Sequence, residues 1–291
     1  MPSVERIIEI MASIRNVVSH RDPAPEDCSP ADSWPHSPVH FALKIGLASE
    51  TGPRQKNDDY CAISWKSDFF AISDGIGGAP YGDVMSRIAC NAAVEAYDAS
   101  GDINEAFRFA NEEVSTVSRY LGEQSGATLL LAEFDENGLS ITYAGDTMAY
   151  RLRDGALEPA MSPGRIVGGG NALDNAVGYG ETVPDRASVD VRAGDRFIMC
   201  TDGVWEYVDE EELVRLISSS SNMPLVADSV CRHAASVGSD NSSCICILVA
   251  SVDVQDGGSR PYPITPTGFA DTPEIDLGPR RPTAQQDCGL E

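Results

Sequence analysis

The ten residues Phe69–Gly78 restrict the fold of this chain more than any other stretch. An apolar run of strand length, Phe69–Ser73, ends at Asp74, and three glycines follow within the next four residues. Because glycine has no Cβ, such a strand end can bring a carboxylate and a backbone carbonyl close to one ligand. A glycine-rich turn with a turn-favouring Asp has the same pattern. The stretch alone leaves both interpretations open, a plain turn and an oxygen-ligand site.

Further acids stand in the same setting, either at the end of an apolar strand pattern or in a tight turn. They are Asp58, Asp59, Asp146, Asp202 and Asp240. If the strands bring these carboxylates to one edge of a sheet, each pair at ~4 Å repels by about 4 kcal/mol at an effective dielectric near 20. A divalent cation would neutralise them best, with Arg54 as a second candidate. Oxygen-only ligands favour Mg²⁺ or Mn²⁺ over Zn²⁺, so the repeated setting favours a metal site.

Composition excludes several other classes of protein. The four histidines are too few and too peripheral for a zinc hydrolase or a serine triad, and no P-loop motif is present. The formal charge of -24 repels nucleic acid and anionic membranes. No stretch approaches the roughly 18 apolar residues of a membrane helix, and the N-terminus lacks the pattern of a signal peptide. With eight scattered cysteines and no C-x-x-C pair, we expect a reduced, cytoplasmic protein that binds neither nucleic acid nor membranes.

The chain divides into three segments by composition. Residues 1–40 predict a short amphipathic helix followed by a Pro-rich linker, and residues 253–291 predict a disordered acidic and Pro-rich tail. Between them, residues 41–252 carry runs of strand patterns separated by two pairs of helices, at 82–99 with 103–121 and at 209–219 with 224–236. This order predicts an α+β fold in which helices cover the outer faces of antiparallel sheets. A long loop is expected at 161–185, and loops of this length tend to be functional.

Six short blocks now make the pattern recognisable. They are Arg54–Asp59, Ser73–Gly78, Ser125–Thr128, Gly145–Thr147, Cys200–Trp205 and Ser239–Ser243. In this order and spacing they resemble the metal-dependent protein phosphatase 2C family, which removes phosphate from phosphoserine and phosphothreonine. The resemblance runs from about residue 41 to 252. It implies a β-sandwich of two antiparallel sheets flanked by helix pairs, with metal ions at one end.

The resemblance also implies how two Mn²⁺ or Mg²⁺ ions are held. Asp74 would bridge both ions. Asp202 and Asp240 would complete one site, and Asp58 with the carbonyl of Gly75 would complete the other. Such a pair of ions lowers the pKa of a bridging water and aligns the resulting hydroxide with phosphorus, so no covalent phosphoenzyme is needed. Cys200, beside these acids, is expected to be an inert core thiol.

Other positions of the family pattern imply supporting roles. Asp59 would hold a metal-bound water, and Arg54 would clamp the substrate phosphate with its planar fork. Asp146, with Asp202, marks where some family members hold a third, looser metal. Glu206 stands where many members have an Asp, and it would support that third metal with one more methylene of reach.

Two departures from the pattern bear on function. Ile76 replaces a histidine that is thought to protonate the leaving group in eukaryotic members, which indicates a bacterial-type enzyme that uses water for this step. The short glycine-rich stretch 163–176 fills the region that shapes substrate choice in the family. We therefore expect a monomeric signalling hydrolase acting on a phosphorylated protein. The alternative is a non-catalytic phosphatase fold that serves as a regulator or scaffold for a partner protein.

Overall fold

The computed structural model describes residues 39–254, apart from positions 65, 78, 80, 123 and 167–171. The expected N-terminal helix and nearly all of the expected linker and tail lie outside the described residues. Among the residues that are described, no helix combines the length and the apolarity needed to cross a membrane.

Two antiparallel sheets form the centre of the fold. The strands of one are β1 (Val39–Glu50), β6 (Met148–Arg153), β7 (Ala156–Pro159), β9 (Arg196–Cys200) and β10 (Ser242–Val254). They lie in the order β1-β10-β9-β6-β7. The strands of the other are β2 (Asp59–Ile63), β3 (Phe69–Asp74), β4 (Leu129–Asp135), β5 (Gly138–Ala144) and β8 (Asp185–Val189). They lie in the order β2-β3-β4-β5-β8, so the expected pair of antiparallel sheets is confirmed.

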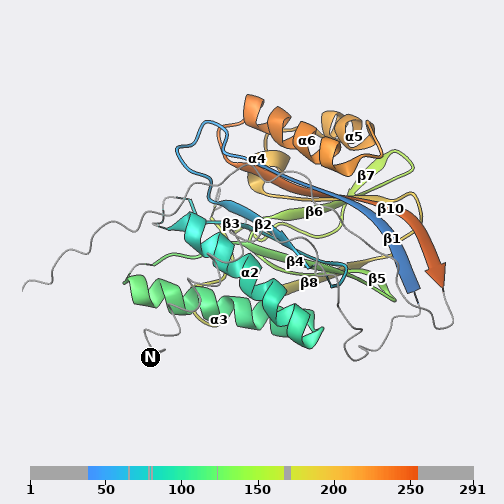
Figure 1. Ribbon diagram of the computed structural model, residues 1–291. Helices are drawn as coiled ribbons and strands as arrows, with labels where there is room; N and C mark the ends of the chain where they lie inside the picture. The colour runs from blue at the N-terminus through green and yellow to red at the C-terminus, as the bar shows by residue number, and fades with distance from the viewer. Residues whose placement is uncertain are drawn as a thin grey trace, which may run out of the picture.

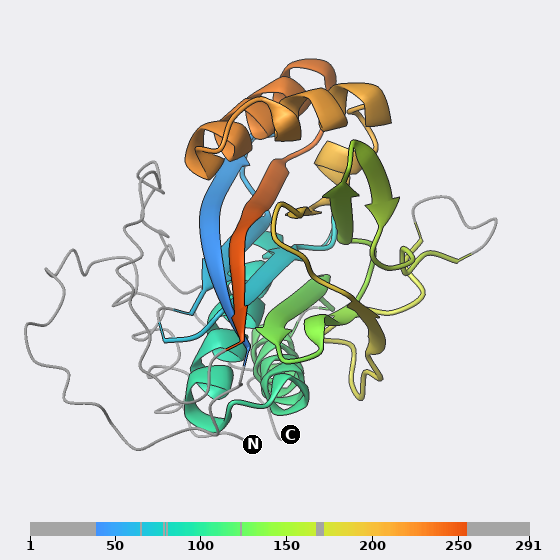
Figure 2. The ribbon, with the colours of Figure 1, turned by 90° about the vertical axis from the view of Figure 1, so that its right-hand side faces the viewer.

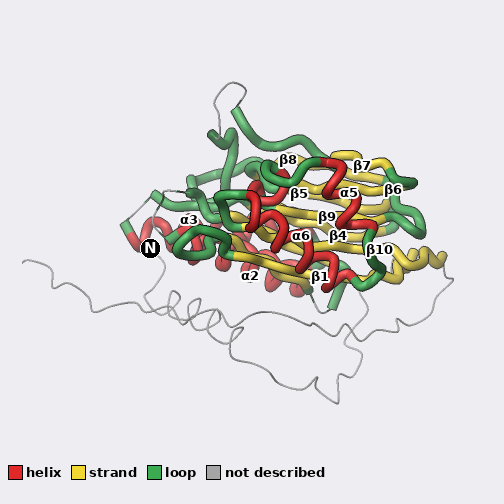
Figure 3. The backbone as a smooth tube through the Cα atoms, turned by 90° about the horizontal axis from the view of Figure 1, so that it is seen from above, coloured by secondary structure: helices red, strands yellow, loops and turns green. Residues whose placement is uncertain are grey.

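Helices cover the outer face of each sheet. They are α2 (Gly82–Ser100), α3 (Ile103–Leu121), α4 (Asp202–Trp205), α5 (Glu210–Ser218) and α6 (Met223–Val237). The pair α2 and α3 packs on the sheet that contains β3, and α5 and α6 pack on the sheet that contains β10 (Figure 1). Figure 2 shows the sheets between the two helix layers, and from above α5 and α6 lie over the strands (Figure 3). The result is a four-layer α/β/β/α sandwich.

The strand β3 is apolar throughout because both of its faces are covered. Phe70 and Ile72 point into the core between the sheets, whereas Phe69 and Ala71 point into the core under α2 and α3. Side chains alternate between the two faces of a strand, so a strand in the middle of a layered fold needs apolar residues at every position. This burial explains why the run has no polar residue before Ser73 and Asp74.

Aromatic packing ties the two sheets together around Phe134 on β4. Its ring centroid lies 6.0 Å from that of Phe70 on the same sheet, and 5.4 Å and 5.7 Å from those of Phe41 and Phe197 on the opposite sheet. Tilted and edge-on aromatic pairs at these separations are favourable beyond the area that they bury. The inter-sheet core therefore fixes how the strand ends of one sheet face those of the other.

Two elements were absent from the sequence-based prediction. The strand β7 has no buried position and therefore no alternation of apolar and polar residues. The helix α4 is a single turn that begins at Asp202, too short to produce a 3.6-residue pattern. The strands β1 and β10 also extend two or more residues beyond the expected limits of the folded segment.

We predict that Phe70→Ala lowers the free energy of unfolding by about 3–5 kcal/mol, because it removes a fully buried aromatic ring from the inter-sheet core. Tyr120→Ala is the matched control, since the Tyr120 side chain is 49% exposed and its loss should change stability by less than about 0.5 kcal/mol. Urea unfolding followed by circular dichroism measures both. Similar losses for the two variants would contradict this view of the core.

Candidate metal centre

The predicted acids gather at one end of the sandwich because several strands begin or end there. Asp59 opens β2 and Asp74 closes β3, and the two are cross-strand neighbours in the antiparallel pair. Asp58 ends the loop that follows β1, seen in blue at the left of Figure 1. The amide of Gly75 donates to the carbonyl of Asp58 at 2.9 Å. This hydrogen bond joins the block Arg54–Asp59 to the block Ser73–Gly78.

Thr201 connects this group to the other sheet. Its hydroxyl donates to Asp59 Oδ2 at 2.8 Å and accepts from the amide of Ser243 at 3.1 Å. Thr201 follows β9 and directly precedes Asp202, so the bond holds Asp202 opposite the Asp59 and Asp74 pair. Thr201 was assigned no role in the sequence analysis, although its place between a buried strand and an acid could have suggested one.

Asn241 fixes the position of Asp240 in a similar way. The buried Asn241 side chain accepts from the amide of Asp58 at 2.9 Å and donates to the carbonyls of Thr51 and Lys56 at 2.8 Å and 2.9 Å. A Cβ on Gly203 would lie 1.7 Å from the Asn241 carbonyl oxygen, so only glycine allows the start of α4 to approach β10 this closely. Asp240 and Asp202 are neighbours at the same end for this reason.

Two threonines place Asp146 near Asp74. The amide of Asp74 donates to Thr128 Oγ1 at 2.9 Å, and the Thr128 hydroxyl shares a 2.7 Å hydrogen bond with the hydroxyl of Thr147. Trp205 Nε1 donates to the carbonyl of Asp146 at 3.0 Å. Two of the short sequence blocks therefore act as supports that bring Asp146 to the edge of the acid group.

Three basic side chains contact these acids in the described structure. Arg54 Nη2 lies 2.6 Å from Asp240 Oδ2, and Lys56 Nζ lies 2.8 Å from Asp58 Oδ1. Arg165 contacts Asp146, Asp202 and Glu206. Neither Lys56 nor Arg165 was assigned a role from the sequence, and Arg165 lies within the segment expected to be a loop, where no pattern marks it.

Burial and mutual repulsion favour the protonated form of several of these acids. Burial first, and then the charges of Asp59 and Asp202, raise the pKa of Asp74 well above its usual range. Burial followed by the charges of Asp146 and Asp240 raises the pKa of Asp202 to about 7. Burial raises the pKa of Asp59 to about 6, although the hydrogen bond from Thr201 opposes the change. Without a counter-ion, part of the group holds protons near neutral pH.

The donor atoms fit a hard divalent cation. Asp59 Oδ1 and Asp202 Oδ1 are buried and accept no hydrogen bond from the described residues, and such oxygens are costly unless a ligand or ion contacts them. A Cβ on Gly75 would lie 2.3 Å from the carbonyl oxygen of Gly82, so this position is closed to any other residue. The described residues do not contain three acidic, histidine or cysteine side chains already drawn together around one point. Arg54 and Lys56 hold Asp240 and Asp58 instead.

Comparison with known proteins identifies the family and agrees with the fold. The family model for protein phosphatase 2C matches residues 49–232, which is more than half of the chain. The chain belongs to the protein phosphatase 2C family. Its relatives include the serine/threonine protein phosphatase PstP of Mycobacterium tuberculosis, which is 26% identical over 251 residues. That match covers 77% of this chain and 48% of PstP, so the chain spans about half the length of this relative.

Solved structures of family members have the same architecture. The Ser-Thr phosphatase MsPP of Mycobacterium smegmatis, solved with cacodylate, is 25% identical, with a TM-score of 0.66 over 72% of this chain and 100% of MsPP. The catalytic domain of PstP, solved with two manganese ions, is 24% identical, with a TM-score of 0.64 over 73% of this chain and 99% of that one. At 24% identity, the similarity to the PstP catalytic domain establishes that the two chains share a fold.

The expected inert role of Cys200 agrees with its surroundings. Its side chain is fully buried at the end of β9, and burial raises the pKa of the thiol well above its usual range. Only the thiolate is an effective nucleophile, so Cys200 is poorly suited to covalent catalysis.

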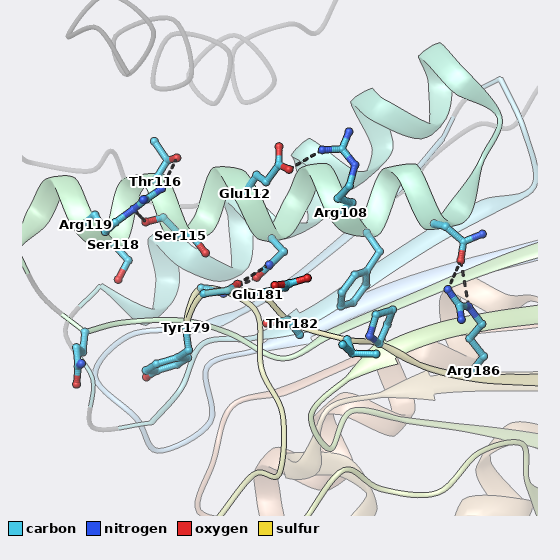
Figure 4. A pocket seen from close by; sticks show the side chains of 18 of the residues that line it. Arg108, Glu112, Ser115, Thr116, Ser118, Arg119, Tyr179, Glu181, Thr182 and Arg186 are labelled. Carbon is cyan, nitrogen blue, oxygen red and sulfur yellow. Dashed lines mark hydrogen bonds and ion pairs between the residues drawn. The ribbon is translucent and has the colours of Figure 1, made fainter. Parts of the chain in front are cut away.

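A separate cavity of about 1160 Å³ lies between α3 and the segment 178–186 (Figure 4). Asn111, on α3, forms one side of it: its Nδ2 donates to the carbonyl of Gly180 at 2.7 Å, and its Oδ1 accepts from the amide of Gly178 at 2.9 Å. Val177 pairs with Ala127, which in turn pairs with Gly75. The wall of the cavity is therefore connected through backbone to the acid group.

The raised pKa values predict that the metal-free protein loses stability as pH rises from 6 to 8. An unfolded Asp has a pKa near 3.9, so the native state binds more protons than the unfolded state until Asp202 ionises at about pH 7. The free energy of unfolding should fall by about 1–2 kcal/mol over this range, as measured by urea unfolding with a chelator present.

Two variants test the cause of this pH dependence. Asp202→Asn should make it shallower, because the amide does not titrate, while Asp59 and Asp74 still contribute. Asp190→Asn is the control, since arginine hydrogen bonds lower the pKa of Asp190 to about 2, far below the range tested. Stability that is constant or rises from pH 6 to 8 would show that the acids are not in the environment described.

Proposed function

We propose that this protein is a metal-dependent serine/threonine phosphatase that hydrolyses phosphoserine and phosphothreonine in a protein substrate. The observation that carries the proposal is the gathering of acids from both sheets at one end, with buried oxygens of Asp59 and Asp202 that accept no hydrogen bond from the described residues. Membership of the protein phosphatase 2C family supports it. The two manganese ions of the PstP catalytic domain support the choice of cofactor.

Two Mn²⁺ or Mg²⁺ ions are proposed to bind in the arrangement implied by the family pattern. Asp74 would contribute to both sites, Asp202 and Asp240 would hold one ion, and Asp58 with the Gly75 carbonyl would hold the other. When bound, the ions supply an activated water and neutralise charge on the phosphate. Residues of the chain provide the rest of the chemistry.

Asp59 is proposed to orient the attacking water. The Thr201 hydroxyl holds Asp59 Oδ2 at 2.8 Å, which fixes the carboxylate plane and leaves Oδ1 free to accept a proton or a hydrogen bond from the water. The Ser243 amide donates in turn to the Thr201 hydroxyl, and this second bond supports the orientation of Asp59. The leaving alkoxide is proposed to take its proton from solvent, since Ile76 has no titratable group.

Arg54 is proposed to change partners during the cycle. In the described structure its Nη2 contacts Asp240 Oδ2, and its Nε donates to the carbonyl of Ser239 at 3.0 Å. Metal binding to Asp240 would remove the need for this pairing. The guanidinium, which is 46% exposed, would then be free to form two parallel hydrogen bonds with a phosphate group.

The first test is hydrolysis of a phosphothreonine peptide by the full chain as Mn²⁺ is added and then removed with a chelator. We expect turnover that depends on metal, and we expect Asp202→Asn to lower kcat by at least about 10²-fold, as is usual when a group that positions or stabilises charge is lost. Asp228→Asn is the control, because Asp228 lies on α6, its side chain is 44% exposed and it pairs with Arg232.

Full activity in Asp202→Asn would refute the assignment of the metal ligands. If calorimetry detects Mn²⁺ binding but no phosphopeptide is hydrolysed, the non-catalytic regulator becomes the better description. If Mn²⁺ does not bind, the proposed metal centre itself is wrong.

A second test concerns Arg54. Arg54→Ala should raise KM for the phosphopeptide by about 10–100-fold at saturating Mn²⁺, the range expected for a charge-assisted hydrogen bond. Metal affinity should not fall, because the variant leaves Asp240 without its competing partner. Arg232→Ala, at an exposed arginine of α6, provides the control. Weaker Mn²⁺ binding with an unchanged KM would assign Arg54 to the metal site rather than to the substrate.

A further inference from the structure

Arg165 forms an unusual set of contacts with three acids. Its Nε and Nη2 lie 2.6 Å and 2.5 Å from Asp146 Oδ2, its Nη1 donates to Glu206 Oε1, and its Nη2 lies 3.3 Å from Asp202 Oδ2. The arginine side chain is only 16% exposed, and that of Asp146 is 5% exposed. One fixed positive charge therefore faces three carboxylates in a largely buried position.

The backbone and a tryptophan hold Arg165 in this place. The amide of Gly164 donates to the carbonyl of Gly145 at 3.0 Å, so the residue before Arg165 is joined to the residue before Asp146. The Arg165 guanidinium carbon lies 4.6 Å from the centre of the Trp205 ring, which is favourable for a cation over an aromatic face. Trp205 Nε1 also donates to the Asp146 carbonyl. The backbone hydrogen bond and the packing on Trp205 therefore fix the Arg165 guanidinium beside the three acids.

The position of Arg165 coincides with the acids that the family pattern assigns to a third metal. Asp146, Asp202 and Glu206 all direct an oxygen towards the guanidinium. The two carboxylate oxygens of Asp202 have different surroundings. Oδ2 faces Arg165, whereas Oδ1 accepts no hydrogen bond from the described residues. Oδ1 is therefore available to the two-metal centre while Arg165 keeps its contacts.

We propose that Arg165 takes the place of a third metal ion, so that the chain operates with two metals and a built-in cation. This inference rests on the proposed phosphatase function. A guanidinium is attached to the chain, so it cannot dissociate into solvent as a bound ion can, and it remains charged at every working pH. It would offset part of the negative charge of Asp146 and Glu206 permanently, which a loosely bound ion does only at high metal concentration.

The experiment counts Mn²⁺ bound to the purified full chain. Protein is dialysed against about 1 mM Mn²⁺, a concentration that fills weak carboxylate sites, and bound metal is measured by elemental analysis. We expect two ions per wild-type chain and three per Arg165→Met chain, because methionine keeps an apolar contact with Trp205 and leaves the three acids without a cation. Arg165→Lys should stay at two because it keeps the charge.

Arg186→Met is the matched control. Arg186 also lies C-terminal to Gly164, but its guanidinium contacts Asn104 and none of the three acids, so the count should remain two. Melting temperature without metal gives an independent readout: Arg165→Met should melt lower than the wild type and recover when Mn²⁺ is added. Arg186→Met should show no such recovery beyond that of the wild type.

The outcomes separate this inference from the proposed function. Three ions on the wild-type chain, or two on a folded Arg165→Met chain, would overturn the role of Arg165. The wild-type count decides even if the variant does not fold. Fewer than two ions on the wild type would overturn the two-metal centre, whereas the difference between Arg165→Met and wild type would still test Arg165.

Discussion

Mutual repulsion among the carboxylates at one end of the sandwich is the constraint on which the rest of the structure depends. Asp59 and Asp74 are cross-strand neighbours, and neither has an ion-pair partner among the described residues. Like charges this close are unfavourable. Burial first, and then this repulsion, raise the pKa of Asp74 and Asp202, and burial raises the pKa of Asp59, so part of the group retains protons. The fold tolerates the arrangement because hydrophobic packing elsewhere stabilises it and because a divalent cation can remove the repulsion.

The three basic residues at this end divide into two groups by how they are held. Arg54 and Lys56 are about half exposed, and each is within reach of a single proposed metal ligand. Exposed ion pairs are weak, so metal ions can displace these side chains at small cost. Arg165 is largely buried, stacked on Trp205 and shared among three acids. A pair of that kind is costly to break, since it would leave buried charge uncompensated. We therefore expect bound metal ions to displace Arg54 and Lys56 from their acids and to leave Arg165 in place.

Much of the fold could be read from the sequence because its signals are local. The run Phe69–Ser73 is apolar on both faces, and α3 has the predicted limits, Ile103–Leu121, because Asp102 caps its first turn and Gly122 ends it. The acids were also recognisable, since each follows a strand or a turn. Arg165 was not, because its partners lie 19 to 41 residues away and its segment has no periodicity. The roles of Thr201 and Asn241 likewise depend on contacts between the two sheets.

The segment from Gly164 to Arg186 links the acid group to the cavity beside α3. Gly164 is bonded to Gly145 at the acid end, and further along the chain Gly178 and Gly180 are bonded to Asn111 at the cavity wall. Both attachments use main-chain atoms of the segment, so side chains between them can change without moving either end. Tyr179 and Val183 are exposed there, 51% and 75% respectively. A member of this family built this way can change the exposed surface around Tyr179 and Val183 while the acids, Arg165 and the strands that carry them stay fixed.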